Sequence, residues 1–178
     1  TMVLVAATAA PGSGAGADFF PLSVFYVEKA YAAGRIPGGF FKREARLSDS
    51  ETLISRIIDR PLRPSFHENY LAETLIVATV LSHDLEFPSD VAAMIGASAA
   101  LSVSDIPLLQ PIGGIRVGMI DGEFITNPNP EEITNSQMNI FMAGSRDAIL
   151  MVEGEANEVS ESVMLDALWY GHEKIQPI

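Results

Sequence analysis

Apolar residues recur along this chain with two spacings, and these spacings separate predicted strands from predicted helices. Continuous apolar and β-branched runs, or strict alternation of apolar with polar residues, predict strands. Asp121-Gly122, between two such runs, is the signal of a type I′ hairpin turn. The segments that predict strands are residues 1–10, 22–26, 74–82, 115–120, 123–126, 138–143 and 149–152.

Three segments with helical spacing complete the pattern, over residues 51–60, 90–103 and 155–172. The first is preceded by Ser48-Asp-Ser-Glu51, which matches a capping box, and Pro61 predicts its end near Arg60. Its predicted apolar face consists of Leu53, Ile54, Ile57 and Ile58. In the second helix, the small residues Gly96 and Ser98 predict close packing against a neighbour.

The order of strands and helices predicts an α+β domain, with a mixed β-sheet and helices packed on it. At 178 residues the chain fits a single domain spanning residues 1–178. No apolar run reaches the ~18 residues that a membrane span needs. Because the first strand begins without a turn or cap, we expect part of its sheet to lie upstream of Thr1.

Charge is distributed unevenly along the chain. The net charge is −12, yet residues 29–63 contain eight basic and four acidic residues, whereas the remainder contains three basic and nineteen acidic residues. A positive segment in an acidic protein predicts a local binding site for an anion. The eight basic residues are Lys29, Arg35, Lys42, Arg43, Arg46, Arg56, Arg60 and Arg63.

Two groups within this segment suit a nucleic acid. Phe40-Phe41-Lys42-Arg43 follows Pro37-Gly-Gly39, and adjacent aromatics beside cations suit stacking on unpaired bases and contact with phosphates. The alternative is that one Phe anchors the loop to the core while the cations are solvated. The second group is Arg56, Arg60 and Arg63, whose planar guanidinium groups suit phosphate. Here the alternative is a solvated helix face paired with Glu51 and Asp59.

No catalytic or metal-binding constellation is visible in the sequence. The acidic residues at 153, 155, 158 and 161 are expected at a helix start, where they compensate the helix dipole, and no histidine accompanies them at ligand spacing. His67, His83 and His172 are scattered, and the absence of cysteine excludes thiolate chemistry and fits a reducing compartment. We therefore expect no catalytic residue and no metal ligand in this chain.

Several long motifs resemble those of bacterial polynucleotide phosphorylase, specifically the first of its two RNase PH-like core domains. The motifs are Ala33-Gly-Arg-Ile-Pro-Gly-Gly-Phe-Phe-Lys-Arg-Glu44, Glu51-Thr-Leu-Ile-Ser-Arg-Ile-Ile-Asp-Arg-Pro-Leu-Arg-Pro64, Ala93-Met-Ile-Gly-Ala-Ser-Ala-Ala-Leu-Ser102, Pro111-Ile-Gly-Gly and Met151-Val-Glu. The resemblance implies an RNase PH-like fold. It also implies a cytoplasmic, trimeric ring that degrades RNA from its 3′ end with phosphate and Mg²⁺, releasing nucleoside diphosphates.

The resemblance also implies a role for individual residues. Phe40, Phe41, Lys42 and Arg43, with Arg46, match a loop that lines a central channel and guides single-stranded RNA. Arg56, Arg60 and Arg63 match arginines along the path to the active site. The phosphate-binding and Mg²⁺-binding residues belong to a second RNase PH-like core that this chain lacks. We therefore expect the RNA-binding, ring-forming half of a homotrimeric enzyme, inactive alone. The alternatives are a structural ring subunit without RNA contact and an active composite site between copies.

Overall fold

The computed structural model describes residues 1–11, 18–38, 44 and 46–178, and it divides the strands between two sheets. Phe40, Phe41, Lys42 and Arg43 lie outside the described residues. The elements are β1 (Met2–Ala9), β2 (Leu22–Glu28), the 3₁₀ helix η1 (Ala30–Ala33), α1 (Asp49–Leu62), the 3₁₀ helix η2 (Arg63–Ser65), β3 (Thr74–Ser82), α2 (Ser89–Ser102), β4 (Gly113–Ile120), β5 (Glu123–Thr126), α3 (Pro130–Asn135), β6 (Met138–Gly144), β7 (Ile149–Ala156) and α4 (Glu161–Ile175).

The first sheet is mixed and the second is antiparallel. In the first, β3 lies between β1 and β2, antiparallel to β1 and parallel to β2, so that Val77 pairs with Ala6 on one side and Phe25 on the other. The second sheet has the order β5-β4-β6-β7, with antiparallel pairing throughout. The predicted α+β class is confirmed, and its mixed sheet is the three-stranded one.

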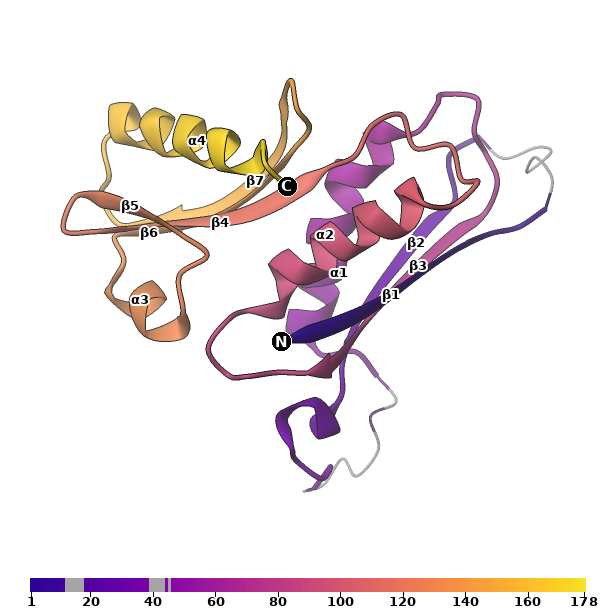
Figure 1. Cartoon of the computed structure of the whole chain (residues 1–178), viewed down its shortest axis with the longest axis horizontal. Coiled ribbons are helices and arrows are strands. Elements are labelled where there is room, and N and C mark those ends of the chain that lie inside the picture. Colours follow the sequence, from indigo (N-terminus) through magenta and orange to yellow (C-terminus); the bar gives the residue numbers. More distant parts are fainter. Residues whose placement is uncertain (12–17, 39–43, 45) are drawn as a thin grey trace.

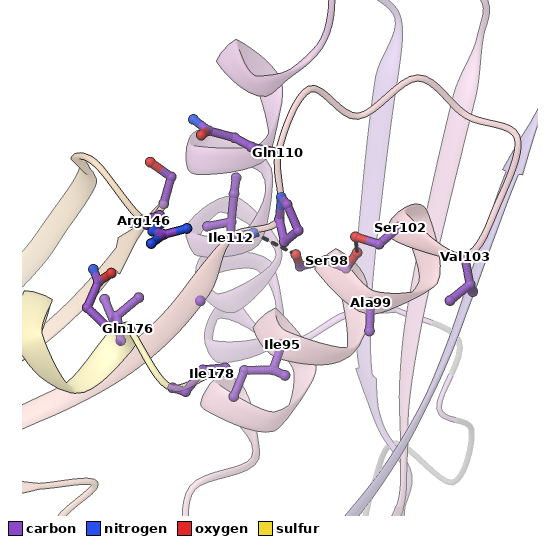
Figure 2. Close-up of a pocket in the computed structure, with 15 residues that line it drawn as sticks. Ile95, Ser98, Ala99, Ser102, Val103, Gln110, Ile112, Arg146, Gln176 and Ile178 are labelled. Atoms are coloured by element: carbon purple, nitrogen blue, oxygen red, sulfur yellow. Dashed lines mark hydrogen bonds between the residues drawn. The ribbon is translucent and has the colours of Figure 1, made fainter.

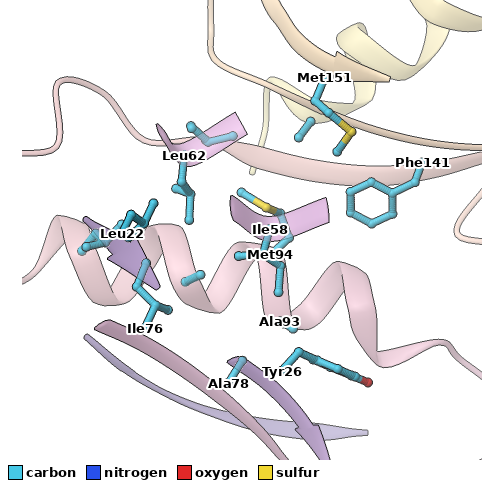
Figure 3. Close-up of a cluster of buried hydrophobic side chains, with 14 of the residues drawn as sticks. Leu22, Tyr26, Ile58, Leu62, Ile76, Ala78, Ala93, Met94, Phe141 and Met151 are labelled. Atoms are coloured by element: carbon cyan, nitrogen blue, oxygen red, sulfur yellow. The ribbon is translucent and has the colours of Figure 1, made fainter. Parts of the chain in front are cut away.

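Helices α1 and α2 lie between the two sheets, and α4 covers the far face of the second sheet (Figure 1). One buried cluster therefore joins all the inner layers: Ile76 of β3, Ile58 of α1 and Met94 of α2 pack with Phe141 and Met151 of the second sheet (Figure 3). An added Cβ at Gly96 would lie 2.7 Å from Val5 Cγ2, so the small residue does permit the predicted close approach of α2 to β1.

Helix α1 begins as predicted and ends later than predicted. The Ser48 hydroxyl accepts from the Glu51 amide, the Glu51 carboxylate accepts from the Ser48 amide, and the capping box is thus complete. The expected stop before Pro61 is wrong, because Pro61 and Leu62 belong to the last turn and are buried. Leu53, expected on the apolar face, is 58% exposed, because the buried side of α1 follows Ser55, Ile58 and Leu62.

The second half of the chain follows the predicted hairpins but not the predicted helix boundary. Asp121 and Gly122 have φ angles of 52° and 82°, as a type I′ turn requires. The last helix begins at Glu161 and not near Glu155, because β7 continues to Ala156 through pairing with β6. The short helix α3, capped by Asn129 and Glu132, was not predicted. In the described part of the chain, no helix has the length and apolarity needed to cross a membrane.

Candidate nucleic-acid interface

The segment that connects the end of β2 to the start of α1, residues 29–47, is called the basic segment here. Figure 1 shows that η1, at the start of this segment, lies beyond the end of the three-stranded sheet, at the bottom of the view. The carboxylate of Glu51 spans the two ends of this segment. One oxygen accepts from the Glu28 amide at 2.8 Å, and the other accepts from the Ser48 amide at 2.6 Å. The last residue of β2 is thus bound to the first turn of α1.

The environment of Glu51 keeps this carboxylate ionised. The residue is 8% exposed, and burial by itself would raise the pKa of Glu51. Hydrogen bonds from the Ser48 and Glu28 amides, together with the charge of Lys29, outweigh burial and lower the pKa below its usual 4.5. The ends of the basic segment are therefore joined by a charged group with fixed donors.

A second carboxylate binds within the segment itself. Glu44 Oε1 accepts from the Ala30 amide at 2.6 Å, and this bond brings residue 44 back to the start of η1. At the end of η1, Gly34 has a φ of 66°, the left-handed conformation that glycine adopts without strain. Glu44 lines a hollow of about 360 Å³ together with Lys29 and Arg35.

The described basic residues differ in how freely they face solvent. Arg35 and Arg46 are exposed, as the anion-site prediction requires. Arg56 is also exposed, forms no ion pair with the residues that the structure describes, and lines a shallow hollow of about 240 Å³ beside Phe25 and Leu47. None of these three arginines has an ion-pair partner among the described residues.

The remaining two predicted arginines are engaged with the protein. Arg60 pairs with Glu153 of β7 at 2.6 Å, in an exposed ion pair. Arg63 binds Asp59 through two nitrogens and donates to the backbone carbonyls of Phe20 and Leu22, at 2.8 and 3.1 Å. Arg63 therefore fixes the start of β2 against the end of α1, and a part in the RNA path stays a prediction for both residues.

A buried charge cluster between α2 and the second sheet was not predicted from the sequence. Arg116 of β4 binds Asp90 at the start of α2, which is 3% exposed, and donates to Asn139 Oδ1 of β6 at 2.7 Å. Its guanidinium carbon lies 5.6 Å from the centre of the Phe141 ring, and its Nε has no hydrogen-bond partner among the described residues. No spacing in the sequence relates residues 90, 116 and 139, so only the fold could reveal this cluster.

Another cavity lies away from these residues. It has a volume of about 710 Å³ and opens between α2, the turn after β6 and the end of α4 (Figure 2). Its walls are mainly apolar, including Ile95, Ile112 and Ile175, and Arg146 is the charged side chain in its lining. The cavity shares no lining residue with the basic segment, so it does not contribute to the candidate interface.

The sequence predicts that the acidic residues near the last helix compensate its dipole and do not bind a metal ion. Glu153 and Glu155 lie in β7, which corrects their expected place at the helix start, whereas Glu161 does lie in the first turn of α4. Among the residues with a described position, no three histidine or acidic side chains come close enough to hold a metal ion.

Comparison with known proteins places the fold and motifs in a family. The model of the 3′ exoribonuclease family, domain 1, matches residues 1–107, and the model of domain 2 of the same family matches residues 110–174. A solved structure described as the Archaeoglobus fulgidus exosome with RNA bound to the active site has a TM-score of 0.70 and 12% identity, covering 98% of this chain and 76% of that chain. At this identity the likeness concerns the fold alone.

Bacterial relatives match the whole chain more closely. The polyribonucleotide nucleotidyltransferases of Geotalea uraniireducens and Brucella anthropi are 57% and 53% identical over 178 residues, 100% of this chain. The Acinetobacter baylyi enzyme is 56% identical over 174 residues. The chain spans about a quarter of the length of these relatives, 26% of the first and 25% of the others. Residues 1–107 alone match the domain 1 model over more than half of the chain, and this chain belongs to the 3′ exoribonuclease family.

Proposed function

We propose that this chain is the RNA-binding, ring-forming half of a phosphorolytic 3′-to-5′ exoribonuclease. The observation that carries the proposal is the excess of basic over acidic residues in the range 29–63, with exposed Arg35, Arg46 and Arg56, in a protein of net charge −12. Similarity to polyribonucleotide nucleotidyltransferases over the whole chain supports the same reading. In this reaction, an RNA of n+1 nucleotides and phosphate give an RNA of n nucleotides and a nucleoside diphosphate.

The chain's own residues supply binding and orientation. Phe40 and Phe41 stack on unpaired bases, whereas Lys42, Arg43 and Arg46 contact the phosphates of single-stranded RNA. Arg56 continues the path along α1, and Arg60 joins it where Glu153 releases its guanidinium group. Arg63, bound to Asp59 and to a backbone carbonyl, fixes the position of β2 relative to α1 along this path.

The remaining parts of the proposal concern the assembly and the chemistry. We propose a second RNase PH-like core as partner and a homotrimeric ring as the working form, with phosphate as co-substrate bound outside this chain. Mg²⁺, which the resemblance implies, finds no set of three acidic or histidine ligands among the described residues. We propose that the ligands of this ion lie in the second core, and we assign it no residue here.

The proposal predicts a specific change in RNA binding when two cations are removed. Replacing Lys42 and Arg43 together by Ala should weaken binding to oligo(A) and reduce the slope of log K against log salt by about 1.4, since each lost phosphate contact contributes about 0.7. Titrations at several salt concentrations measure this slope. The matched control is Arg146→Ala with Lys174→Ala, which removes the same charge far along the chain and should leave the slope unchanged.

The outcomes separate the proposed role from its alternatives. An equal loss of slope in both double variants would mean that net charge alone drives binding, and the loop assignment would be wrong. Binding that is undetectable at low salt would favour a structural ring subunit. Phosphate-dependent release of nucleoside diphosphates from poly(A) by the chain alone, above the Lys42/Arg43 variant, would favour a composite active site between copies.

A further inference from the structure

Acidic side chains within an RNA-binding segment oppose a polyanion unless they have another task. Residues 29–63 contain four: Glu44, Asp49, Glu51 and Asp59. Asp49 lies in the first turn of α1, where it compensates the helix dipole, and Asp59 pairs with Arg63. Glu44 and Glu51 have no arginine or lysine partner among the described residues, and both accept from backbone amides instead.

The bonds of these two carboxylates have a common geometry. Glu51 reaches back 23 residues to the Glu28 amide, and Glu44 reaches back 14 residues to the Ala30 amide. Both acceptors lie on the returning side of the basic segment, and both donors lie on its departing side. The second oxygen of Glu51 accepts from Ser48, which fixes the carboxylate against the start of α1. The two bonds therefore connect the end of the basic segment to its start at two places.

The charged form of the carboxylates suits this task. A backbone amide donates a stronger hydrogen bond to a carboxylate than to a neutral acceptor, and Glu51 is held ionised by its donors and by Lys29. Lys29 and Arg35 line the same hollow as Glu44, so nearby positive charges partly offset its negative charge. The electrostatic disadvantage for RNA is thereby reduced, while the geometric constraint remains.

We propose that Glu44 and Glu51 are positioning residues that hold the basic segment in its RNA-binding geometry. Through these bonds they set where Arg35 and Arg46 stand relative to Arg56, so this arrangement does not have to form when RNA binds. This inference rests on the proposed function. It makes a prediction opposite in sign to simple electrostatics, under which removal of any acid from the segment would strengthen RNA binding.

Glu44 offers the sharper test because it is exposed, so its replacement leaves the core intact. Glu44→Ala removes both the charge and the acceptor. Glu44→Gln removes the charge but keeps an amide oxygen that accepts from Ala30. Glu68, whose exposed side chain forms no hydrogen bond or ion pair with described residues, provides the matched controls Glu68→Ala and Glu68→Gln. Affinity for oligo(A) at low salt is measured for each variant.

Positioning predicts that Glu44→Ala binds RNA about three- to tenfold more weakly than the original chain, with a salt slope smaller by about 0.7, one phosphate contact. Glu44→Gln should bind within about twofold of the original chain or more tightly, and both Glu68 variants should do the same. Amide hydrogen exchange of Ala30, followed by NMR without RNA, should accelerate in Glu44→Ala and stay slow in Glu44→Gln.

Three results would overturn the inference. If Glu44→Ala bound RNA as tightly as Glu68→Ala while Lys42/Arg43 replacement still weakened binding, the proposed function would stand and the positioning role would fall. Unchanged exchange of the Ala30 amide in Glu44→Ala would have the same meaning. If Lys42/Arg43 replacement had no effect, the RNA-binding function itself would fall, and the positioning role with it.

Discussion

At the scale of single residues, Glu51 links a helix cap to the end of a strand, and its ionisation therefore affects stability. The hydrogen bonds from Ser48 and Glu28 lower the pKa of this carboxyl in the folded state, although burial opposes them. A group whose pKa is lowered on folding contributes stability above its unfolded pKa, about 4.5 here, and loses it as the pH falls through the folded pKa. Glu51 should thus stabilise the protein at neutral pH and not in acid.

Replacement of Glu51 by Gln tests this linkage. At pH 7 the variant should be less stable by about 1–2 kcal/mol, because one charged acceptor and the reciprocal cap are weakened. The difference should shrink as the pH falls below 4.5 and through the lowered pKa of the folded carboxyl, since the native side chain then becomes neutral like that of Gln. Urea unfolding of both proteins across this pH range measures it. Parallel stability curves would show that the charge of Glu51 contributes nothing.

The types of residue at the interface were predictable, but their partners were not. Charge counting identified the basic segment, and Arg46 and Arg56 are exposed as that prediction requires. The sequence could not show that Arg63 donates hydrogen bonds to Asp59, Phe20 and Leu22, because Phe20 and Leu22 lie about 40 residues earlier in the chain. Phe40 to Arg43, which carry most of the prediction, lie outside the described residues.

At the scale of elements, the features that depend on local geometry were predicted best. The capping box of α1 and the type I′ turn at Asp121-Gly122 involve residues within four positions of each other, so sequence spacing determines them. The start of α4 was misplaced because pairing of Asn139 with Glu155, between distant segments, keeps residues 155 and 156 in a strand. The start of α3 also has a local signal in the sequence, since Asn129 and Glu132 have the spacing of a capping box.

Packing of α4 on the second sheet gives a prediction at this scale. A second buried cluster lies between α4 and the second sheet and includes Val117, Met142 and Ala167. At Gly171, an added Cβ would collide with Met142 Sδ and lie 2.9 Å from Val117 Cγ2. Alanine favours helix over glycine by about 1 kcal/mol, and overpacking costs about 1–3 kcal/mol. Gly171→Ala should therefore destabilise the protein by up to about 2 kcal/mol.

Thermal unfolding compares Gly171→Ala with Ser162→Ala on the exposed face of the same helix. The control should change the melting temperature by little, since Ser162 is exposed and loses only a hydroxyl contact with Ser160 at the start of the helix. A Gly171→Ala protein as stable as the control would mean that Met142 moves aside at no cost. The close approach of α4 to β4 and β6 would then not need glycine.

At the scale of the whole molecule, the division into two sheets was beyond sequence patterns. Alternation predicts which residues share a face, but it does not say which strands share a sheet. The layers arise because α1 and α2 are apolar on two sides: Ile58 and Met94 meet Ile76 of the first sheet and Phe141 of the second (Figure 3). Arg116 adds a polar link between the second sheet and α2 by binding Asp90.

The prediction of a single domain over residues 1–178 can be tested against the division into two family domains at residues 107 and 110. Because one buried cluster includes side chains from both parts, separate unfolding would expose apolar surface on each. Calorimetry should therefore show one transition, with an enthalpy of about 120 kcal/mol near 60 °C and equal calorimetric and van't Hoff values.

The Arg116→Ala variant sharpens this experiment. It leaves the buried Asp90 carboxylate without its cation, which costs about 3–5 kcal/mol, and it removes a bond between the two family domains. If the apolar cluster is what couples them, the variant should melt at a lower temperature and still in one transition. Two transitions in the variant alone would assign the coupling to the Arg116 cluster. Two transitions in both proteins would make residues 1–107 and 110–174 separate cooperative units, each with its own stability.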